Sequence, residues 1–270
     1  MNQMNDIDLK AKEIRRIIIK ESYRAHVGHI GSALSIADIL AAVYFGRNPI
    51  RFSQKPDQDY FVLSKGHAAL ALYAVLNLLG KISDEDLERY CADDTYLGVH
   101  PNYHVSGIDF STGSLGQGFS FGVGTALAAK MKKNTSRTFA VISDGECDEG
   151  SVWESMMFAA QHQLSNLILI IDNNGQQALG YTRDVLDISP LAEKWKSFGW
   201  DVHEADGNNG NVINEILENL NYKEGKPHVI VAHTIFGKGV SYMENRIKWH
   251  YWPMNEDEYH LAMKEIEAGS

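Results

Sequence analysis

The sequence predicts an α/β fold of three layers, with a mostly parallel sheet in the middle and helices on both faces. Two runs of strand length, ending at Ser143 and at Ile171, are hydrophobic almost throughout, as buried parallel strands are. Residues 150–163 between them contain no Pro and no internal Gly, and they predict a helix. These segments form a βαβ unit, whose right-handed crossover brings both strand ends to the same edge of the sheet.

The N-terminal third is predicted to be mostly helical. Residues 6–24 carry an apolar stripe at helical spacing and predict an amphipathic helix. Two glycines then interrupt the chain, and Ser35 is expected to be the N-cap of the next helix. Residues 59–63 predict a short strand, and the Ala- and Leu-rich segment that follows, up to Leu79, predicts a buried helix.

The remainder continues the alternation of helices and strands. A Ser-x-x-Asp start at Ser83 predicts a capped helix up to Cys91, and residues 96–110 predict an irregular loop. The Gly- and Ala-rich segment 119–132 predicts a helix that packs closely, which is compatible with an interface between protein chains. Beyond Gly180 we expect helices at 190–198, 212–221 and 255–267, and strands at 200–204 and 228–232.

Length and composition limit the class of protein. The chain has 270 residues, of which 44% are hydrophobic and 22% are charged, as in ordinary globular proteins. No internal repeat, low-complexity tract or Pro- and Ser-rich linker divides it. We therefore expect a single domain over residues 1–270.

Charge and cysteine content exclude several partners. The net charge of −10 argues against a general nucleic-acid binder. The polar N-terminus does not resemble a signal peptide, and no apolar run has the length of a membrane span. Cys91 and Cys147 form neither a disulfide framework nor a zinc spacing. We expect a cytoplasmic protein with no nucleic-acid or membrane partner.

The turns that end the two central strands carry candidate metal ligands. Asp144-Gly145 follows the first strand, and Asn174-Gly175 follows the second. Carboxylate and carboxamide oxygens suit Mg²⁺, which usually keeps phosphate oxygens and water as further ligands. The N-terminus of the crossover helix near Gly150 would favour an anion beside them. The sequence predicts a Mg²⁺–diphosphate site, although two ordinary polar turns would have the same composition.

Several motifs together resemble the transketolase family. An Asp-Gly pair followed about thirty residues later by Asn174 is similar to the thiamine diphosphate motif. GHIG at 28–31, SKGHAALALY at 64–73 and STGSLGQG at 111–118 resemble transketolase segments and occur in the same order. The resemblance covers residues 9–250.

The glycine spacing at 116–122 is one residue too long for a dinucleotide fingerprint, and no strand is predicted before it, so a Rossmann nucleotide site is rejected.

The resemblance implies a cofactor and roles for individual residues. The cofactor would be thiamine diphosphate with Mg²⁺, or with Ca²⁺ or Mn²⁺ in its place. The implied metal ligands are Asp144, Asn174 and Gln176. The implied cofactor-binding residues are His67, Gly113, Leu115, Asp144, Gly145, Glu146, Asn174 and His250. The implied catalytic residues, placed for proton transfer and sugar binding, are His29, His67 and His100.

This sequence departs from the family pattern at a few positions. Ile30 and Ser114 replace common prolines, Ser143 replaces the glycine before Asp144, and Tyr251 follows His250 where glycine is usual.

From the residues alone, other interpretations remain open. His29 is compatible with a surface loop, and His67 with a satisfied core histidine. His104 has no family counterpart and is expected at the surface. Lys238 follows a Gly-rich strand end and would either approach the diphosphate or be solvated.

The resemblance also implies partners. Glu149 and Glu154 match family glutamates between the two active centres of a dimer, although acids at a helix N-terminus also favour the dipole. The glutamate that activates the pyrimidine ring lies in transketolases on a second domain, and we find no counterpart before Ser270. We therefore expect a partner subunit carrying that domain, an α₂β₂ assembly, and no activity of this chain alone.

The implied reaction is the transfer of a two-carbon ketol unit from a ketose or its phosphate to an aldose or its phosphate. The donor and acceptor sugars are not identified. Two alternatives remain: a subunit of another thiamine diphosphate enzyme, such as a 2-oxoacid decarboxylase or dehydrogenase, and a non-catalytic binding protein with the same fold.

Overall fold

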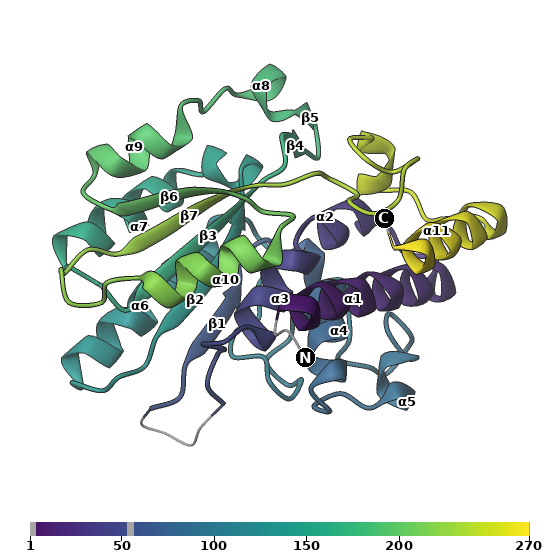
Figure 1. The fold of residues 1–270 in the computed structure, drawn as a ribbon, viewed down its shortest axis with the longest axis horizontal. Coiled ribbons are helices and arrows are strands. Elements are labelled where there is room, and N and C mark those ends of the chain that lie inside the picture. The colour runs from purple at the N-terminus through teal and green to yellow at the C-terminus, as the bar shows by residue number, and fades with distance from the viewer. Residues whose placement is uncertain (1–3, 53–56, 270) are drawn as a thin grey trace.

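A five-stranded parallel sheet forms the centre of the molecule, with strand order β1-β2-β3-β7-β6 (Figure 1). The computed structural model describes residues 4–52 and 57–269, so the first three residues and Ser270 of the predicted domain lie outside it. The strands are β1 (Tyr60–Leu63), β2 (Thr138–Ser143), β3 (Leu167–Asn173), β6 (Asp201–Asp206) and β7 (His228–His233). Each coincides with a predicted strand to within two residues, and the α/β class is confirmed.

Helices cover both faces of the sheet, as the three-layer prediction requires. The longer helices are α1 (Met4–Ala25), α3 (Ala37–Phe45), α4 (Ala69–Leu78), α6 (Gln117–Met131), α7 (Gly150–Gln161), α9 (Leu191–Ser197), α10 (Gly210–Asn219) and α11 (Glu256–Ala268). Shorter elements are α2 (Ile30–Ser35), α5 (Asp84–Leu87), α8 (Thr182–Val185), the 3₁₀ turns η1 (Gly66–Ala68), η2 (Gly145–Asp148) and η3 (Ile247–His250), and the hairpin β4 (Gln176–Gln177) with β5 (Gly180–Tyr181).

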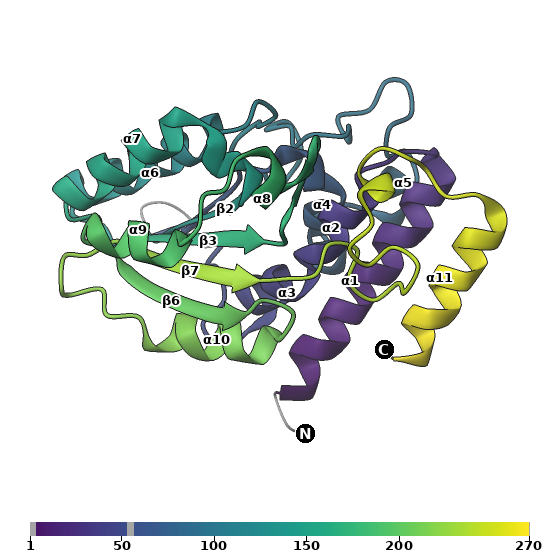
Figure 2. The same cartoon turned by 90° about the horizontal axis from the view of Figure 1, so that it is seen from above.

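Alternate residues of the strands separate two apolar cores, because successive strand side chains point to opposite faces. Val141 and Ile170 belong to the core beneath α1, α3, α4 and α10, whereas Ile142 and Leu169 belong to the core beneath α6, α7 and α9. Figure 2 shows α6 and α7 on one side of the strands and α10 and α3 on the other. The α7 crossover joins neighbouring strands β2 and β3, so the predicted βαβ unit is confirmed.

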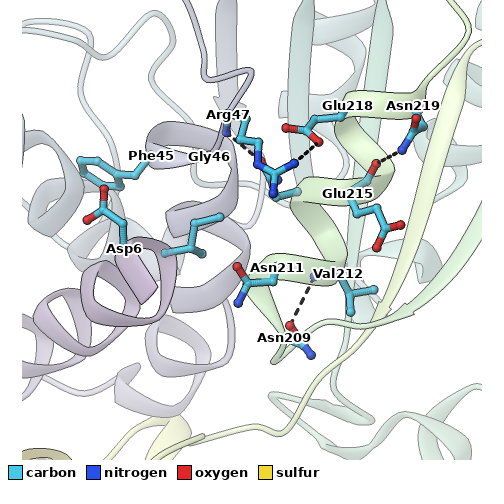
Figure 3. Close-up of a pocket in the computed structure, with 12 residues that line it drawn as sticks. Asp6, Phe45, Gly46, Arg47, Asn209, Asn211, Val212, Glu215, Glu218 and Asn219 are labelled. Carbon is cyan, nitrogen blue, oxygen red and sulfur yellow. Dashed lines mark hydrogen bonds and ion pairs between the residues drawn. The ribbon is translucent and has the colours of Figure 1, made fainter. Parts of the chain in front are cut away.

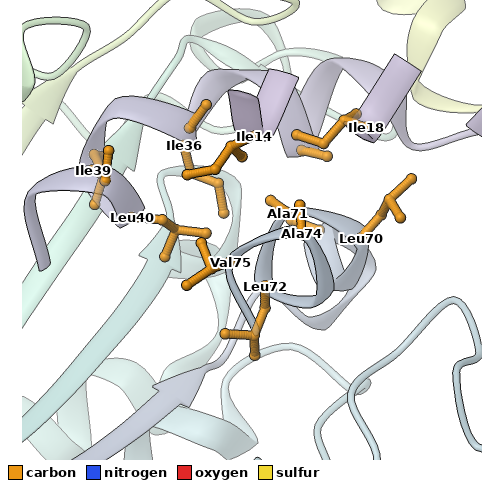
Figure 4. Packing of buried hydrophobic residues seen from close by; sticks show 14 of the residues in the cluster. Ile14, Ile18, Ile36, Ile39, Leu40, Leu70, Ala71, Leu72, Ala74 and Val75 are labelled. Atoms are coloured by element: carbon orange, nitrogen blue, oxygen red, sulfur yellow. The ribbon is translucent and has the colours of Figure 1, made fainter. Parts of the chain in front are cut away.

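The larger core contains a helix–helix interface beside the sheet. Ile14 and Ile18 of α1 face Ile36 and Leu40 at α3, with Val75 of α4 packed against them (Figure 4). These five side chains are fully buried. Fully burying one such aliphatic side chain contributes about 1.5–3 kcal/mol, so this interface holds the N-terminal helices firmly against the site described below.

Two predictions about helix boundaries are wrong. Ser35 does not cap α3, because its hydroxyl donates to Ser32 O and to the Asp172 carboxylate, at 3.0 and 2.7 Å. Ser83 does cap a helix by accepting from Asp86 N, but α5 ends at Leu87 rather than at Cys91. Cys91 has a φ of 57° and donates its N–H to Leu97 O, which turns the chain away.

The structure also bears on membrane spanning and on disulfide bonding. No helix in the described part of the chain combines the length and apolar character that crossing a bilayer requires. Cys91 and Cys147 are both free thiols, and Cys147 is buried.

The C-terminal helix α11 begins with a capping box between Asn255 and Glu258 and packs along α1.

Candidate active site

The turns after β2 and β3 meet at the carboxyl edge of the sheet. The Asp144 carboxylate accepts hydrogen bonds from Gly145 N at 2.9 Å and from Gly175 N at 2.7 Å. The Thr182 hydroxyl donates to it at 3.3 Å. Asp144 therefore lies beside the turn that carries Asn174, which is the arrangement expected from the βαβ unit.

Asp144 is a buried carboxylate without a cationic partner among the described hydrogen bonds and ion pairs. It is 1% exposed. Burial, together with the nearby charge of Asp172, raises the pKa of Asp144 to about 7. A divalent cation at this position would relieve both effects, because it would replace the lost hydration and screen the two carboxylates from each other.

Behind Asp144 lies a buried polar network that sequence reasoning missed. The Asp172 carboxylate accepts hydrogen bonds from Ser35, Thr234 and Asn174 and forms an ion pair with Lys65. Lys65 and Asp172 are both 0% exposed. The partners of Asp172 lie 62 to 137 positions away in the sequence, apart from the near neighbour Asn174, so no local pattern marks this network.

The same network orients the predicted metal ligands. The Asn174 amide donates to Asp172 at 2.8 Å, and its oxygen accepts from Gln176 N at 2.9 Å. Gln176 is 4% exposed, and neither its side-chain oxygen nor its nitrogen has a hydrogen-bond partner within the described chain. Leaving a buried amide unpaired costs about 1–3 kcal/mol. The unpaired side chain of Gln176 therefore indicates a bound group, from outside this chain, that interacts with it.

Glu146 holds three segments of the site together. Its carboxylate accepts from the Ser64 hydroxyl, from Gly116 N at 2.8 Å and from Ser143 N at 3.4 Å. Burial raises the pKa of Glu146 to about 7. All of these contacts are within the chain, so the structure places Glu146 as a support for the Gly116 loop, and its predicted contact with a cofactor stays a prediction.

The backbone conformation and close packing at position 116 require a glycine. Gly116 has a φ of 79°, and a Cβ there would lie 2.4 Å from the Ser151 hydroxyl and 2.8 Å from Glu149 Cβ. The loop and the first turn of α7 are therefore packed directly together.

Three histidine rings from distant parts of the chain come together at this edge. The ring centroids of His29 and His67 are 5.5 Å apart, those of His29 and His250 are 5.1 Å apart, and those of His67 and His250 are 5.4 Å apart. His29 N donates to His250 O at 2.9 Å, which joins the two segments directly. The structure thus brings together three histidines that the sequence singled out.

The environment keeps these histidines neutral. Burial lowers the pKa of His29, and the charge of His100 adds to this effect. Burial also lowers the pKa of His67, with contributions from Lys65 and the neighbouring histidines. Burial lowers the pKa of His250 to about 4. Each neutral ring offers one donor and one acceptor nitrogen near pH 7, and the Nδ1 atoms of His29 and His250 are buried without a partner in the described residues.

His100 and the Gly-rich loop form the outer side of the cluster. A Cβ on Gly113 would lie 3.7 Å from the His100 ring, so the two are in contact range. The Tyr73 hydroxyl donates to His100 O at 2.9 Å, and Thr112 donates to Leu63 O at 2.6 Å, which fixes the loop against the end of β1. Leu115 is half-buried in the same loop.

Other candidate residues lie away from these contacts. Lys238 pairs with Glu244 at 3.7 Å, which favours its interpretation as a solvated side chain. His104 is exposed and stacks on Tyr96. Glu149 and Glu154 are both exposed at the start of α7, and their predicted interface role stays a prediction.

One surface cavity lies away from these residues. It has a volume of about 570 Å³ and is bounded by α1, α3 and α10 (Figure 3). Arg47 in its wall pairs with Glu218, and Asn209 caps α10. None of the predicted site residues lines it. The candidate site is therefore identified by its buried unpaired polar atoms and not by this cavity.

Comparison with known proteins decides the family. Residues 8–267 match the model described as transketolase, thiamine diphosphate binding domain. The chain belongs to the transketolase family. A relative in Phocaeicola vulgatus, named as one of the subunits of apulose-4-phosphate transketolase, is 39% identical over 98% of this chain and 95% of its own length. The 6-deoxy-6-sulfo-D-fructose transketolase subunit SqwG of Clostridium sp. is 40% identical over 98% of both.

Solved transketolase structures share the fold. The transketolase of Campylobacter jejuni superimposes with a TM-score of 0.88 and 28% identity, over 99% of this chain. This chain spans only 43% of the length of that transketolase. It likewise spans 41% of human transketolase, with which it is 33% identical. The chain thus corresponds to an N-terminal transketolase subunit, like the relatives that match it over nearly their whole length.

The residues present fit a thiamine diphosphate with its metal ion. The side-chain amide of Gln176 and the Nδ1 atoms of His29 and His250 are buried polar atoms that lack hydrogen-bond partners within the described chain. Such atoms are rare in folded proteins unless a ligand or water satisfies them. Oxygen donors suit a Mg²⁺ ion, and ring N–H groups suit phosphate oxygens.

Proposed function

We propose that this chain is the thiamine diphosphate- and Mg²⁺-binding subunit of a two-subunit transketolase that transfers a ketol unit from a ketose or its phosphate to an aldose or its phosphate. The observation that carries the proposal is the cluster of His29, His67 and His250, with its unpaired ring nitrogens, at the sheet edge that bears Asp144 and Asn174. Family membership supports the cofactor, and the names of relatives support the reaction class.

Each residue has a task that follows from its surroundings. Asp144, Asn174 and Gln176 would hold the metal ion, and His67 and His250 would donate to phosphate oxygens. Gly113 and Leu115 would lie against the flat ring of the cofactor. When bound, thiamine diphosphate supplies an electron sink for breaking a carbon–carbon bond beside a carbonyl. His29 and His100, neutral near pH 7, would bind sugar hydroxyls and move protons to and from them.

The site is proposed to be completed by a second protein chain, the C-terminal transketolase subunit that carries the pyrimidine-binding domain. Large apolar side chains stand exposed beside the site: Leu179 is 81% exposed, Tyr251 57% and Trp252 63%. Tyr251 and Trp252 directly follow His250, and Leu179 lies between β4 and β5. Clustered apolar exposure of this kind is typical of a covered interface. We propose an α₂β₂ assembly, one domain per copy of this chain, in the cytoplasm.

The proposal is tested by assaying ketol transfer with thiamine diphosphate and Mg²⁺. The donors are xylulose 5-phosphate, apulose 4-phosphate and 6-deoxy-6-sulfofructose, since relatives are named for the last two. The assay uses this chain alone and this chain mixed with a co-expressed C-terminal subunit. We expect activity only in the mixture. Activity of the pure chain alone would contradict the requirement for a partner.

A third outcome distinguishes the alternatives. If the mixture binds the cofactor but transfers no ketol unit, release of CO₂ from 2-oxoacids would identify another thiamine diphosphate enzyme. Cofactor binding without any turnover would indicate a binding protein. The relatives named as transketolase subunits favour ketol transfer over both.

A further inference from the structure

A second group of potential metal ligands lies where β6 and β7 begin. Asp201 and His203 of β6 and His228 of β7 each offer one ligand atom, and these atoms lie within 4.8 Å of one another. Asp201 and His203 are two residues apart on one strand, so their side chains share a face. Asp201 is the register partner of His228 on the adjacent strand. The parallel sheet itself therefore places the three side chains together.

The separations suit a small metal ion. Asp201 Oδ2 lies 3.1 Å from His203 Nε2 and 2.8 Å from His228 Nδ1. With metal–ligand bonds of about 2.0–2.1 Å, neighbouring ligand atoms are roughly 2.9 Å apart at right angles and roughly 3.4 Å apart in a tetrahedron. Both measured separations are close to this range. The ligand atoms of His203 and His228 lie within 4.8 Å of each other. Because His203 is 34% exposed, a rotation of its side chain would bring this third pair into the same range.

We propose that Asp201, His203 and His228 form a binding site for a divalent transition-metal ion, with Zn²⁺ as the reference ion. Two imidazole nitrogens and one carboxylate oxygen favour Zn²⁺, Co²⁺ or Ni²⁺ over Mg²⁺ and Ca²⁺, which prefer oxygen ligands alone. Three protein ligands leave a further coordination position for water. His228 is 1% exposed, and burial lowers its pKa, so it is neutral and able to bind metal near pH 7.

This site is distinct from the proposed Mg²⁺ site. Asp201 and His228 begin their strands, whereas Asp144 and Asn174 follow the opposite ends of β2 and β3. The five residue steps of β7 alone span roughly 17 Å. The two sites also differ in ligand chemistry, with imidazole at one and carboxylate and amide oxygens at the other.

The metal would join an edge strand to its neighbour. β6 is the last strand of the sheet and pairs only with β7. A metal ion bound to both strands stabilises the folded chain, because the ligands are assembled only in the native sheet. We therefore expect Zn²⁺ to raise the unfolding temperature.

The test uses the full chain without an affinity tag, saturated with thiamine diphosphate and Mg²⁺. Co²⁺ is titrated while its visible absorption is recorded, and Zn²⁺ is then added to displace it. We expect one equivalent of Co²⁺ per chain. His203→Gln and Asp201→Asn should each weaken Co²⁺ binding at least about tenfold and abolish the rise in unfolding temperature caused by Zn²⁺.

Matched variants separate this site from other histidines. His260→Gln removes an exposed histidine that pairs with Glu256, and His29→Asn removes one from the active-site cluster. Both should bind Co²⁺ as the unmodified chain does. His203 is partly exposed, so His203→Gln should fold normally even if Asp201→Asn does not. Unchanged Co²⁺ binding by His203→Gln, or loss of binding in His29→Asn, would overturn the proposal.

Discussion

Two buried aspartates at opposite ends of the sheet have opposite electrostatic environments. Asp59, before β1, is 2% exposed and Asp144, after β2, is 1% exposed. Burial alone would raise the pKa of Asp59, but hydrogen bonds from Arg51 and Arg137 outweigh it and lower the pKa. No cationic side chain in the described part of the chain donates a hydrogen bond to Asp144, and burial together with the charge of Asp172 raises its pKa to about 7.

The hydrogen-bond partners of the two aspartates indicate a structural role for Asp59 and a ligand-binding role for Asp144. Asp59 accepts hydrogen bonds from both guanidinium groups and from Arg137 N, at 2.6–3.1 Å. Asp144 accepts hydrogen bonds mainly from backbone N–H groups, and the described chain gives it no ion pair. The charge of Asp59 is thus balanced within the chain, whereas the proposed metal ion would balance that of Asp144.

The largest expected effect comes from removing a partner of Asp59. Arg137→Ala should lower the free energy of unfolding by about 3–5 kcal/mol, because it leaves a buried carboxylate only partly paired. Urea denaturation measures this loss. Arg47→Ala is the control: Arg47 is 51% exposed in its pair with Glu218, so its removal should cost at most about 1 kcal/mol. Equal losses in both variants would contradict the comparison.

The corresponding change at Asp144 should affect binding instead of folding. Asp144→Asn should weaken Mg²⁺-dependent binding of thiamine diphosphate at least about 100-fold, equivalent to about 2.7 kcal/mol. Its unfolding free energy without cofactor should stay within about 1 kcal/mol of the unmodified chain, since the buried charge itself is unfavourable. Fluorescence titration and urea denaturation measure the two quantities. A destabilised variant that still binds the cofactor would reverse the assignment.

The histidine cluster should make stability depend on pH. His250 has its pKa lowered from 6.5 to about 4, so below pH 6.5 the unfolded chain binds a proton that the folded chain does not. Stability should therefore fall as pH falls, by about 2 kcal/mol from this residue at pH 5. In His250→Asn the loss between pH 7.5 and 5 should be smaller by that amount, and His260→Asn should behave like the unmodified chain.

The smallest expected effect concerns Gln176. Gln176→Met should raise the stability of the cofactor-free chain by about 1 kcal/mol, because it removes an unpaired buried amide. Gln177→Met is the matched control and should lose stability, since Gln177 donates to Asp148 at 2.9 Å. If the Gln176 side chain holds the metal ion, Gln176→Met should also weaken cofactor binding, which calorimetry detects. Lower stability in Gln176→Met would contradict this interpretation.

Local patterns predict the parts of the fold that depend on neighbouring residues. The strands β2 and β3 and the helix α7 are predicted well because continuous apolar runs and polar Gly turns mark their ends. The prediction of Ser35 as a cap is wrong because its hydroxyl bonds to Asp172, 137 residues away. The hairpin β4–β5 has only two residues per strand, too few for a periodic signal.

The same distinction applies to the site. The resemblance predicts the site histidines, and the structure brings His29, His67 and His250 together. The ion pair of Lys65 with Asp172 escapes prediction because its partners are 107 positions apart. The group formed by Asp201, His203 and His228 escapes prediction because strand register, not sequence spacing, brings His228 to the other two residues. The arrangement of His203 and His228 around Asp201 becomes visible only when the register between β6 and β7 is known.

The hydrogen bond from His29 to His250 has a consequence for the order in which the site forms during synthesis. Asp144 and Asn174 belong to one compact βαβ unit that is complete once β3 has emerged. The histidine cluster joins segments 221 positions apart, so it cannot close until His250 has left the ribosome. Closing so long a loop delays the contact. Cofactor binding would then report that synthesis has passed His250, because a shorter nascent chain has the proposed metal ligands but not the complete histidine cluster.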